Sequence, residues 1–273
     1  MFDTWVINLE KDIQNFNIMK ERLSDKNIDP KRFNAIYGKM IKDFTPYKKY
    51  ISSHNRYFGP SGQVGCGLSH YKLLDDIYNK YKYSSNRFSL ILEDDAIPLF
   101  KDKKQLNEII KDIPIDCDIL FLYCQGKCGY GTWGEKKYIK KNTPFSSGAV
   151  AYFVRHSSIP KILKNKINFH IDIQWYANWT INTYLYADKL FNVDKSTSYN
   201  CGKFKQNFMT DTLDKIVPLD NMTMTEALKF RVFKIPFTNI ELDGFQLYNI
   251  FNGISIIIIG IIVFSILRYN NWI

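Results

Sequence analysis

The stretch Phe88-Ser-Leu-Ile-Leu-Glu-Asp-Asp-Ala-Ile-Pro98 joins a short apolar run to three consecutive carboxylates. The apolar residues predict a strand that is buried on both faces of a parallel sheet. Glu93, Asp94 and Asp95 would then follow the carboxyl end of this strand, where open α/β sheets bind their ligands. If the backbone stays extended, Glu93 and Asp95 point to one side and Asp94 points to the other.

This acidic cluster has two interpretations. Three adjacent acids repel one another, so they are tolerated only in water or beside a cation. A hard divalent ion, Mg²⁺ or Mn²⁺, shared with a phosphate group would suit carboxylate oxygens. The other interpretation is a solvated acidic turn that ends a strand, and the stretch alone does not decide between them.

The composition indicates a folded chain with a large core. The 273 residues are 45% hydrophobic and 16% aromatic, which suffices for one large α/β domain or two small ones. The net charge of +10 could face nucleic acid, an anionic membrane or an anionic substrate. No zinc-finger spacing, RNA-binding motif or basic helix occurs, so nucleic acid is not expected as a partner. Five cysteines without a repeated short spacing argue against a disulfide framework and a zinc site.

The segments before the acidic cluster predict a βαβ opening. Residues 4–9 predict a first buried strand, a helical face follows up to residue 24, and residues 33–38 predict a second strand. The glycine-rich stretch 62–70 opens a longer helix. Glycines before a helix N-terminus form a natural anion site, although glycines also simply permit tight turns. His70, taken singly, is more often a hydrogen-bonded structural histidine than a catalyst.

The C-terminal part predicts a membrane anchor. Residues 245–267 contain no charged side chain, and 23 helical residues span about 34 Å, enough for a bilayer core of about 30 Å. The alternative is a buried β-rich core segment, because isoleucine favours strands. The N-terminus has no basic region and no long apolar core, so it is not a secretory signal. We therefore expect the main domain on the cytosolic side of a membrane.

The predicted domain organisation follows from these patterns. It comprises a main α/β domain over 1–198, a peripheral extension over 199–244, the transmembrane helix 245–267 and a short tail over 268–273.

Four stretches, in this order, resemble glycosyltransferase family 25. They are Val6–Leu9 with the helix that ends in Met19–Leu23, Phe33–Gly38, Gly65–Tyr71 with its Gly-Cys-x-Leu-Ser-His run, and Leu90–Asp95 with its Leu-Glu-Asp-Asp run. The resemblance covers roughly residues 4–193. It implies a GT-A-like fold, in which one α/β domain with a mostly parallel central sheet has a nucleotide-binding half and an acceptor half.

The resemblance also implies a chemistry. A metal-dependent enzyme of this kind moves a sugar from a nucleotide-sugar donor, usually UDP-linked, to a glycan, lipid-linked or protein acceptor, with inversion. Glu93 and Asp95 match the acids that hold Mn²⁺ or Mg²⁺, and the ion neutralises charge on the departing UDP. The residues expected on the donor side are Asn8, Leu9, Ser69, His70 and Asp94.

Asp172 is the expected catalytic base. An inverting transfer needs one group to take the proton of the acceptor hydroxyl. The apolar neighbours of Asp172 would raise its pKa, and Trp175 or Tyr176 could stack on a sugar. The alternative is that Asp172 caps a helix that begins at Ile173.

Two departures from the family pattern favour a rival function. The family's aspartate-glycine pair after the second strand is Tyr37-Gly38 here, and the last histidine is His170, whereas many GT-A enzymes complete the metal site with a late histidine. The rival is a catalytically inactive relative that works as a membrane-tethered binding or structural protein. The intact Glu93–Asp95 run and the Ser69-His70 pair favour the enzyme.

Overall fold

The computed structural model describes residues 2–81, 87–123, 137–140, 148–194, 232–234 and 241–243. The chain divides into two compact units, one of residues 1–199 with 219–221 and one of residues 200–218 with 222–273. The described part of the second unit is an antiparallel pair of strands, β10 (Val232–Lys234) and β11 (Glu241–Asp243).

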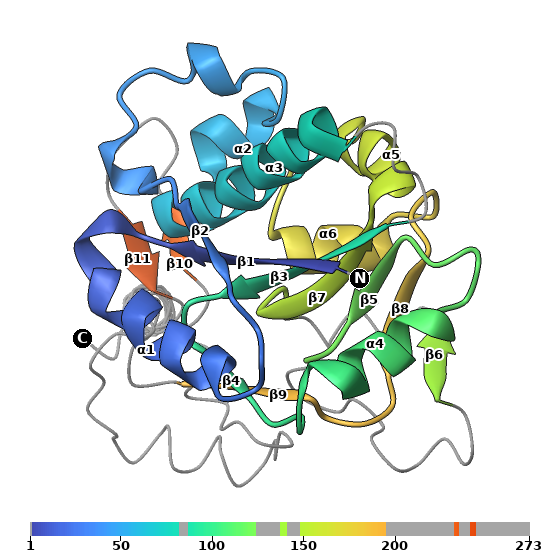
Figure 1. The fold of residues 1–273 in the computed structure, drawn as a ribbon. Coiled ribbons are helices and arrows are strands. Elements are labelled where there is room, and N and C mark those ends of the chain that lie inside the picture. Colours follow the sequence, from blue (N-terminus) through green and yellow to red (C-terminus); the bar gives the residue numbers. More distant parts are fainter. Residues whose placement is uncertain are drawn as a thin grey trace, which may run out of the picture. The chain divides into compact units, whose positions relative to one another are not determined.

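A seven-stranded sheet forms the centre of the first unit (Figure 1). Its strands are β1 (Phe2–Asn8), β2 (Lys31–Asn34), β3 (Phe88–Glu93), β5 (Ile119–Phe121), β6 (Tyr138–Lys140), β7 (Ala151–Arg155) and β8 (Thr183–Tyr186), in the order β2-β1-β3-β7-β5-β8-β6. Strands β1, β2 and β3 are mutually parallel, as are β5 and β8, whereas β7 and β6 are antiparallel to their neighbours. The predicted α/β class with a mostly parallel central sheet is confirmed.

Helices cover both faces of this sheet. Figure 1 shows α2 (Ser53–Phe58) and α3 (Ser61–Tyr81) above the sheet, and α1 (Ile13–Ser24) and α4 (Lys103–Lys111) below it. The shorter helices α5 (Ile159–Leu163) and α6 (Ile171–Ala177) share a buried cluster with α3. Four single-turn 3₁₀ helices and a short antiparallel pair complete the described elements: η1 (Glu10–Asp12), η2 (Gly38–Met40), η3 (Thr45–Tyr47), η4 (His156–Ser158), β4 (Ala96–Pro98) and β9 (Phe191–Val193).

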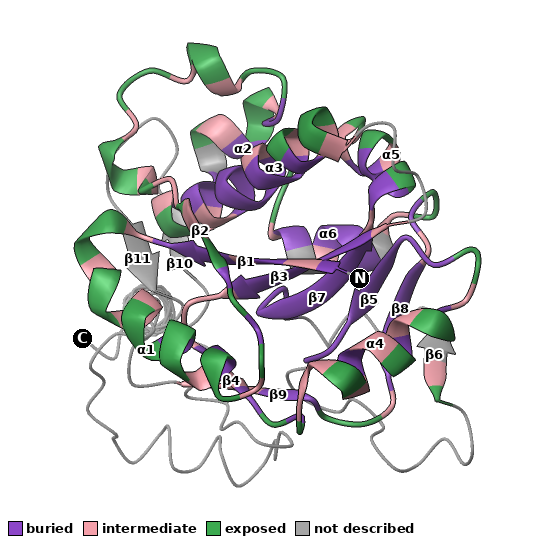
Figure 2. Ribbon diagram, viewed as in Figure 1, coloured by how far each residue is buried: buried purple, intermediate pink, exposed green. Residues whose placement is uncertain are grey.

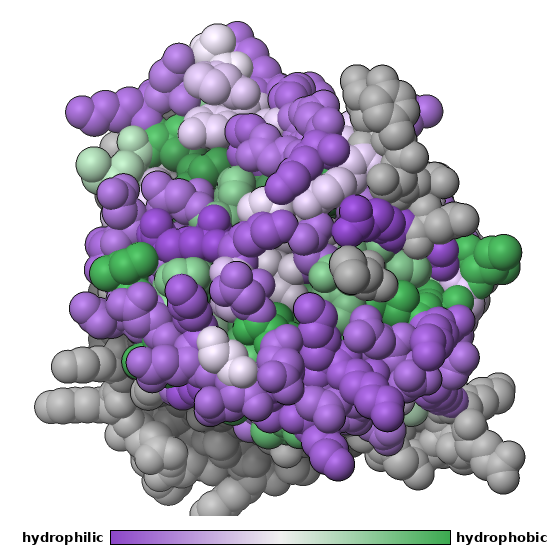
Figure 3. All heavy atoms as spheres, viewed as in Figure 1, coloured by the Kyte–Doolittle hydropathy of each residue, from purple (hydrophilic) through white to green (hydrophobic). Residues whose placement is uncertain are grey.

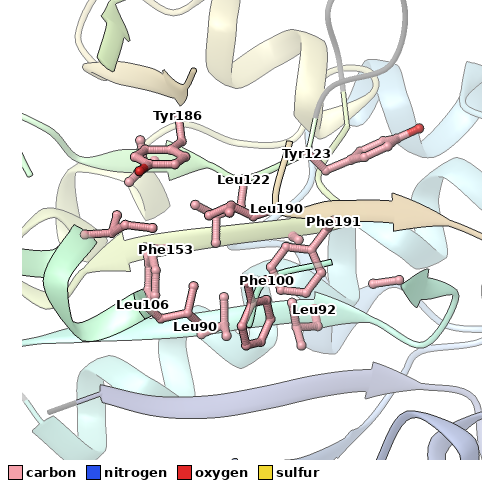
Figure 4. Close-up of a cluster of buried hydrophobic side chains, with 14 of the residues drawn as sticks. Leu90, Leu92, Phe100, Leu106, Leu122, Tyr123, Phe153, Tyr186, Leu190 and Phe191 are labelled. Atoms are coloured by element: carbon pink, nitrogen blue, oxygen red, sulfur yellow. The ribbon is translucent and has the colours of Figure 1, made fainter. Parts of the chain in front are cut away.

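Strand β3 lies between two apolar clusters, as its sequence predicts. Ile91 belongs to the cluster beneath α3, whereas Leu90 and Leu92 belong to the cluster on the side of α1 and α4. This alternation is the period of two that a strand imposes on its side chains. Figure 4 shows Leu90 and Leu92 packed near Phe100 and Phe191. Each fully buried aliphatic side chain stabilises the fold by about 1.5–3 kcal/mol.

The burial pattern of the surrounding helices agrees with this layered core. In Figure 2 the side of α3 that meets the sheet is buried and its outer side is exposed or intermediate. The surface in view in Figure 3 is mostly hydrophilic, with small separate hydrophobic areas. The buried apolar residues form two clusters in which strands of the sheet pack with the helices.

The glycine-rich stretch lies inside α3, which begins at Ser61. A Cβ atom on Gly65 would lie 2.6 Å from the Gly38 nitrogen and 2.6 Å from the Ile36 oxygen. A Cβ atom on Gly67 would lie 3.0 Å from the Ile171 side chain. These glycines let the chain after β2 and the helix α6 approach α3 closely, a use that neither sequence interpretation of the stretch anticipated.

The predicted transmembrane helix 245–267 lies outside the described residues. Among the residues that are described, no helix is both long and apolar enough to cross a membrane.

Candidate active site

Three parallel strands end at one edge of the sheet. In the register, Asn8 of β1 pairs with Asn34 of β2, and Ile7 of β1 pairs with Glu93 of β3. The antiparallel strand β7 begins at the same edge, where the Glu93 amide donates a 2.8 Å hydrogen bond to the Val150 carbonyl. This edge is where α/β sheets bind ligands, because the carboxyl ends of parallel strands open a crevice there.

The acidic run changes direction at the end of β3. The strand stops at Glu93, and Asp94 and Asp95 form a turn that leads into β4. The extended backbone that would place Glu93 and Asp95 on one side therefore does not continue past Glu93. Each of the three carboxylates meets a different set of neighbours.

Glu93 faces helix α3. Its Oε1 lies 3.2 Å from His70 Nε2 and 3.6 Å from Cys66 Sγ. The other ring nitrogen of His70, Nδ1, lies 2.8 Å from the Tyr152 hydroxyl. The ligand atoms of Cys66, His70 and Glu93 lie within 4.8 Å of one another, so this triad is compatible with a bound metal ion.

Asp94 faces β1. Its Oδ2 accepts a 2.6 Å hydrogen bond from Asn8 Nδ2, which also donates to the Asp12 carbonyl at 2.8 Å. The Asn8 Oδ1 accepts a 2.8 Å hydrogen bond from Arg32 Nε. Burial raises the pKa of Asp94, and the hydrogen bond from Asn8 offsets part of that increase. Asn8 is thus a buried link between Asp94 and Arg32 at the strand tip where the sequence predicted it.

Asp95 has a buried carboxylate oxygen, and no described residue forms an ion pair with it. Its Oδ1 has no hydrogen-bond partner among the described residues. Burial, followed by the negative charges of Glu93 and Asp94, raises the pKa of Asp95 well above its usual range. An unsatisfied buried carboxylate costs free energy, and a bound cation removes that cost. Carboxylate oxygens such as those of Asp95 are the ligands that hard divalent ions such as Mn²⁺ and Mg²⁺ prefer.

Tyr123 lies close to the same acids. Burial, with smaller contributions from the charges of Asp95 and Glu93, raises the pKa of Tyr123 to about 12. Figure 4 shows its hydroxyl pointing away from the apolar cluster that holds the ring. Tyr123 therefore brings a neutral hydroxyl to the surroundings of the acidic turn.

A surface pocket of about 390 Å³ lies at the carboxyl ends of β1 and β2. It is lined by Leu9, Glu10, Lys11, Asn34, Ala35 and Tyr37. Tyr37 is 37% exposed, and Lys11 Nζ lies 4.5 Å from the centre of its ring. The structure thus places Leu9 in this pocket, together with Tyr37, the position at which the resemblance implies an acid.

Ser69 is a buried link between α3 and the segment after β2. Its hydroxyl donates to the Gly65 carbonyl at 2.7 Å and accepts from the Ile36 amide at 2.8 Å. Ser69 therefore holds the chain that continues from the pocket residues Asn34 and Ala35. Its neighbour His70 points to Glu93, so the Ser69-His70 pair supports both parts of the candidate site.

Asp172 lies in the first turn of α6, which begins at Ile171 with His170 at the N-cap position. Its side chain lies outside the described residues. The first turn of α6 packs on α3, since Ile171 lies against Gly67. Asp172 is therefore on a helix beside the part of α3 that carries Cys66 and His70.

The prediction that Trp175 or Tyr176 stacks on a sugar is wrong. Trp175 is fully buried, with its ring centre 5.3 Å from that of Tyr152, and Tyr176 stacks on Phe121 at 4.6 Å. Both rings belong to the core, because the helical spacing of α6 turns them toward the sheet.

Sequence reasoning missed Cys66, which contacts Glu93, and Tyr152, which contacts His70. Cys66 precedes His70 by four residues, so on a helix the two side chains share one face, and this spacing could have identified Cys66. Tyr152 reaches His70 because β7 pairs with β3. No local pattern shows that pairing.

Comparison with known proteins shows two similarities in sequence. The model of glycosyltransferase family 25 (LPS biosynthesis protein) matches residues 1–175. Procollagen galactosyltransferase 1-B of Xenopus laevis is 28% identical over 130 residues, which cover 44% of this chain and 21% of that protein. The chain therefore spans about a fifth of the length of this relative.

A solved structure, that of A197 from STIV, covers 76% of this chain and 99% of its own chain. The TM-score of 0.33 and the sequence identity of 10% are too low for this similarity to support an argument about fold or function.

Proposed function

Because this chain belongs to glycosyltransferase family 25, we propose that it transfers a sugar from a nucleotide-sugar donor, a UDP-hexose, to a glycan, lipid-linked or protein acceptor. The observation that carries the proposal is the acidic turn at the end of β3, with its buried and unsatisfied Asp95 oxygen, at the sheet edge that also holds the pocket. Such a donor would place its nucleoside in the pocket and its phosphates beside a cation at the acidic turn.

The pocket beside β1 and β2 would receive the nucleoside. The exposed ring of Tyr37 offers a surface on which a base can stack, and Asn34 offers a polar group for base or ribose. Asn8 connects this pocket to the acidic turn. It is the last residue of β1, next to the pocket residue Leu9, and its side chain donates a hydrogen bond to Asp94. The phosphates would then lie between the pocket and Asp95.

Asp95 and Glu93 would hold the divalent ion. When bound, Mn²⁺ or Mg²⁺ neutralises negative charge on the leaving nucleotide. The residues of this chain orient the donor, and Asp172 takes the proton of the acceptor hydroxyl as the sugar carbon is attacked from the face opposite the nucleotide. The inverted configuration of the product follows from that direction of attack.

A second candidate is an inactive relative that binds a nucleotide sugar without turnover. The observation that favours it is Tyr37, which stands in the pocket where the family has an acid. The two candidates differ in turnover and not in donor binding.

A membrane location is a separate proposal. The uncharged segment 245–267 would anchor the enzyme, with the main domain on the cytosolic side. Full-length protein should resist carbonate extraction from membranes, and protease added to intact microsomes should digest the main domain. Release by carbonate would contradict the anchor, and protection of the domain would contradict the topology.

The enzyme is tested by UDP release from a panel of UDP-sugars with detergent-purified full-length protein and Mn²⁺. We expect release with at least one sugar, its loss in EDTA, and its loss in Asp95→Asn. Asp76→Asn is the matched control, because Asp76 is an exposed acid on α3 that pairs with Lys72. Donor binding without release or transfer would favour the inactive relative, and release in EDTA would contradict the metal.

A further inference from the structure

A chain of hydrogen bonds runs from the core to Glu93. The Tyr152 hydroxyl of β7 lies 2.8 Å from His70 Nδ1, and His70 Nε2 of α3 lies 3.2 Å from Glu93 Oε1. Cys66 Sγ approaches the same carboxylate oxygen at 3.6 Å. Two side chains of α3 therefore meet one oxygen of Glu93, and Tyr152 of β7 is connected to that oxygen through His70.

The directions of these hydrogen bonds follow from the burial of Tyr152. Tyr152 is fully buried, and burial raises its pKa well above the usual range, so the hydroxyl keeps its proton. Its hydrogen-bond partner in the described structure is His70 Nδ1. If Tyr152 donates to Nδ1, a neutral His70 carries its proton on Nε2 and donates it to Glu93. This arrangement gives each proton an acceptor.

His70 has no access to a substrate. Its side chain is 1% exposed, whereas that of Glu93 is 26% exposed. The His70 ring is enclosed by Tyr152, with ring centres 5.7 Å apart, and by the edge of Trp175 at 6.0 Å. Any effect of His70 on a ligand in the crevice therefore acts through Glu93.

We propose that His70 and Tyr152 are positioning residues that fix the Glu93 carboxylate for the divalent ion of the donor site. The proposal rests on the function proposed above. Partners that hold a metal ligand in place raise metal affinity, because they remove the ligand's freedom before the ion binds. Loss of such a partner typically weakens metal affinity by 10–100-fold.

The rival is direct coordination of a metal by Cys66, His70 and Glu93. A thiolate and an imidazole would select a softer ion such as Zn²⁺. Coordination through Nε2 would require the proton of His70 on Nδ1, which would leave the Tyr152 hydroxyl proton without an acceptor among the described contacts. The hydrogen bonds account for the same short distances without a metal.

The test measures Mn²⁺ affinity by the electron paramagnetic resonance signal of free Mn²⁺, with full-length protein. Tyr152→Phe removes only a hydroxyl, and His70→Phe removes both ring nitrogens. We expect each to weaken Mn²⁺ binding by about 10–100-fold. His70→Gln should recover much of the loss, because its amide can still donate to Glu93. The double variant should bind no more weakly than His70→Phe, because Tyr152 acts through His70.

Tyr71→Phe is the matched control. It removes a buried hydroxyl from the next residue of α3, where Tyr71 donates to the Asn165 carbonyl at 2.8 Å. Its Mn²⁺ affinity should equal that of the wild type. If His70→Phe does not fold, the Mn²⁺ affinities of Tyr152→Phe and His70→Gln still test the positioning role.

Three results would overturn the proposal. Wild-type Mn²⁺ affinity in Tyr152→Phe and His70→Phe would refute the positioning role and leave the Mn²⁺-dependent transfer intact. A thiolate-to-cobalt absorption band in Co²⁺-loaded protein that disappears in Cys66→Ser would establish direct coordination instead. Absence of Mn²⁺ binding in the wild type would refute this role together with the metal dependence proposed above.

Discussion

Asp95 is the residue in which stability and the proposed function conflict. Its carboxyl group is buried beside two other acids and has no hydrogen-bond partner for Oδ1 among the described residues. The pKa of Asp95 is raised in the folded state, so its contribution to stability is full below about pH 4 and is lost as the pH rises through the raised pKa. Above the usual pKa of an aspartate, Asp95 therefore destabilises the metal-free protein.

The first prediction is that Asp95→Asn stabilises the metal-free protein. Asparagine keeps the shape of the side chain and removes the charge, so the free energy of unfolding at pH 7 should rise by about 1 kcal/mol and Tm by about 2–4 °C. The measurement is thermal unfolding in EDTA at pH 7 and pH 5, and the gain should be smaller at pH 5. A loss of stability at pH 7 would show that the carboxylate is satisfied in the folded state.

The second prediction concerns Asp172. As the base, Asp172→Asn should fold, bind a UDP-sugar normally and lose kcat by about 10²–10⁴-fold. The measurement compares the rate of sugar transfer in a single turnover with the affinity for the UDP-sugar, in Asp172→Asn and in the wild type. An acid in the first turn of α6 that only interacts with the helix dipole would cost about 0.3–1 kcal/mol of stability and leave turnover unchanged. Near-wild-type kcat would therefore remove Asp172 from the mechanism.

Individual residues were predictable where the sequence places them at a strand end. Asn8, Glu93 and Asp95 fall at the edge that the strand pattern predicted. Trp175 was not predictable, because the residues next to it in sequence do not show which face of α6 meets the core. The buried link from Asn8 to Asp94 depends on the pairing of β1 with β3, which is also absent from any local pattern.

At the scale of elements, the contact between α3 and η2 fixes the wall of the site. Gly38 of η2 lies against α3 so closely that a Cβ on Gly38 would lie 1.8 Å from the Ser61 oxygen and 3.0 Å from the Gly65 nitrogen. The same helix carries Cys66 and His70 toward Glu93. A small shift of α3 would therefore move the side chains that hold this acid.

The third prediction is that Gly65→Ala destabilises the fold. Alanine favours a helix over glycine by about 1 kcal/mol, but here the new Cβ would meet backbone atoms of Gly38 and Ile36 at 2.6 Å. Overpacking of this kind costs about 1–3 kcal/mol, so Tm should fall, as measured by circular dichroism. Lys72→Ala, at an exposed position of α3, is the control and should change little. A Tm increase in Gly65→Ala would mean that α3 and η2 separate easily.

Among the elements, β3 and the helix after residue 62 could be predicted from hydrophobic spacing. The role of the glycines within that helix could not, since their partners are the distant residues Gly38 and Ile171. Strand β2 ends at Asn34 and not at the predicted boundary, residue 38. The residues from this strand end onward, Asn34, Ala35 and Tyr37, line the pocket.

At the scale of the whole molecule, His156 makes the stability of the domain depend on pH. His156 is 2% exposed and stacks on Tyr81, and its Nε2 lies 2.9 Å from the Ser89 hydroxyl. Burial, followed by the positive charge of Arg87, lowers its pKa from 6.5 to about 4. The unfolded chain therefore takes up a proton between pH 6.5 and pH 4 that the folded domain does not.

The fourth prediction follows from this difference. The free energy of unfolding should decrease as the pH falls through this window, by about 2–3 kcal/mol from His156. The variant His156→Gln should show a shallower decrease when urea unfolding is compared at pH 7, 5.5 and 4.5. Parallel curves for the two proteins would show that His156 is protonated in the folded state.

For the whole molecule, the α/β class and the mostly parallel sheet were predictable from alternating apolar segments. The strand order, with β7 inserted antiparallel between β3 and β5, was not, because it depends on contacts between distant segments. The predicted helix 245–267 lies outside the described residues. The metal ligands and the base remain predictions at this scale.

The central claim is that the pocket and the acidic turn form one donor site that requires a metal. Calorimetric titration of UDP into full-length protein tests it most directly, with Mn²⁺ or with EDTA. We predict that UDP binds with Mn²⁺, that EDTA and Asp95→Asn each abolish binding, and that Tyr37→Ala weakens it. The claim would be contradicted if the affinity for UDP in EDTA, or that of Asp95→Asn with Mn²⁺, equalled the affinity of the wild-type protein with Mn²⁺.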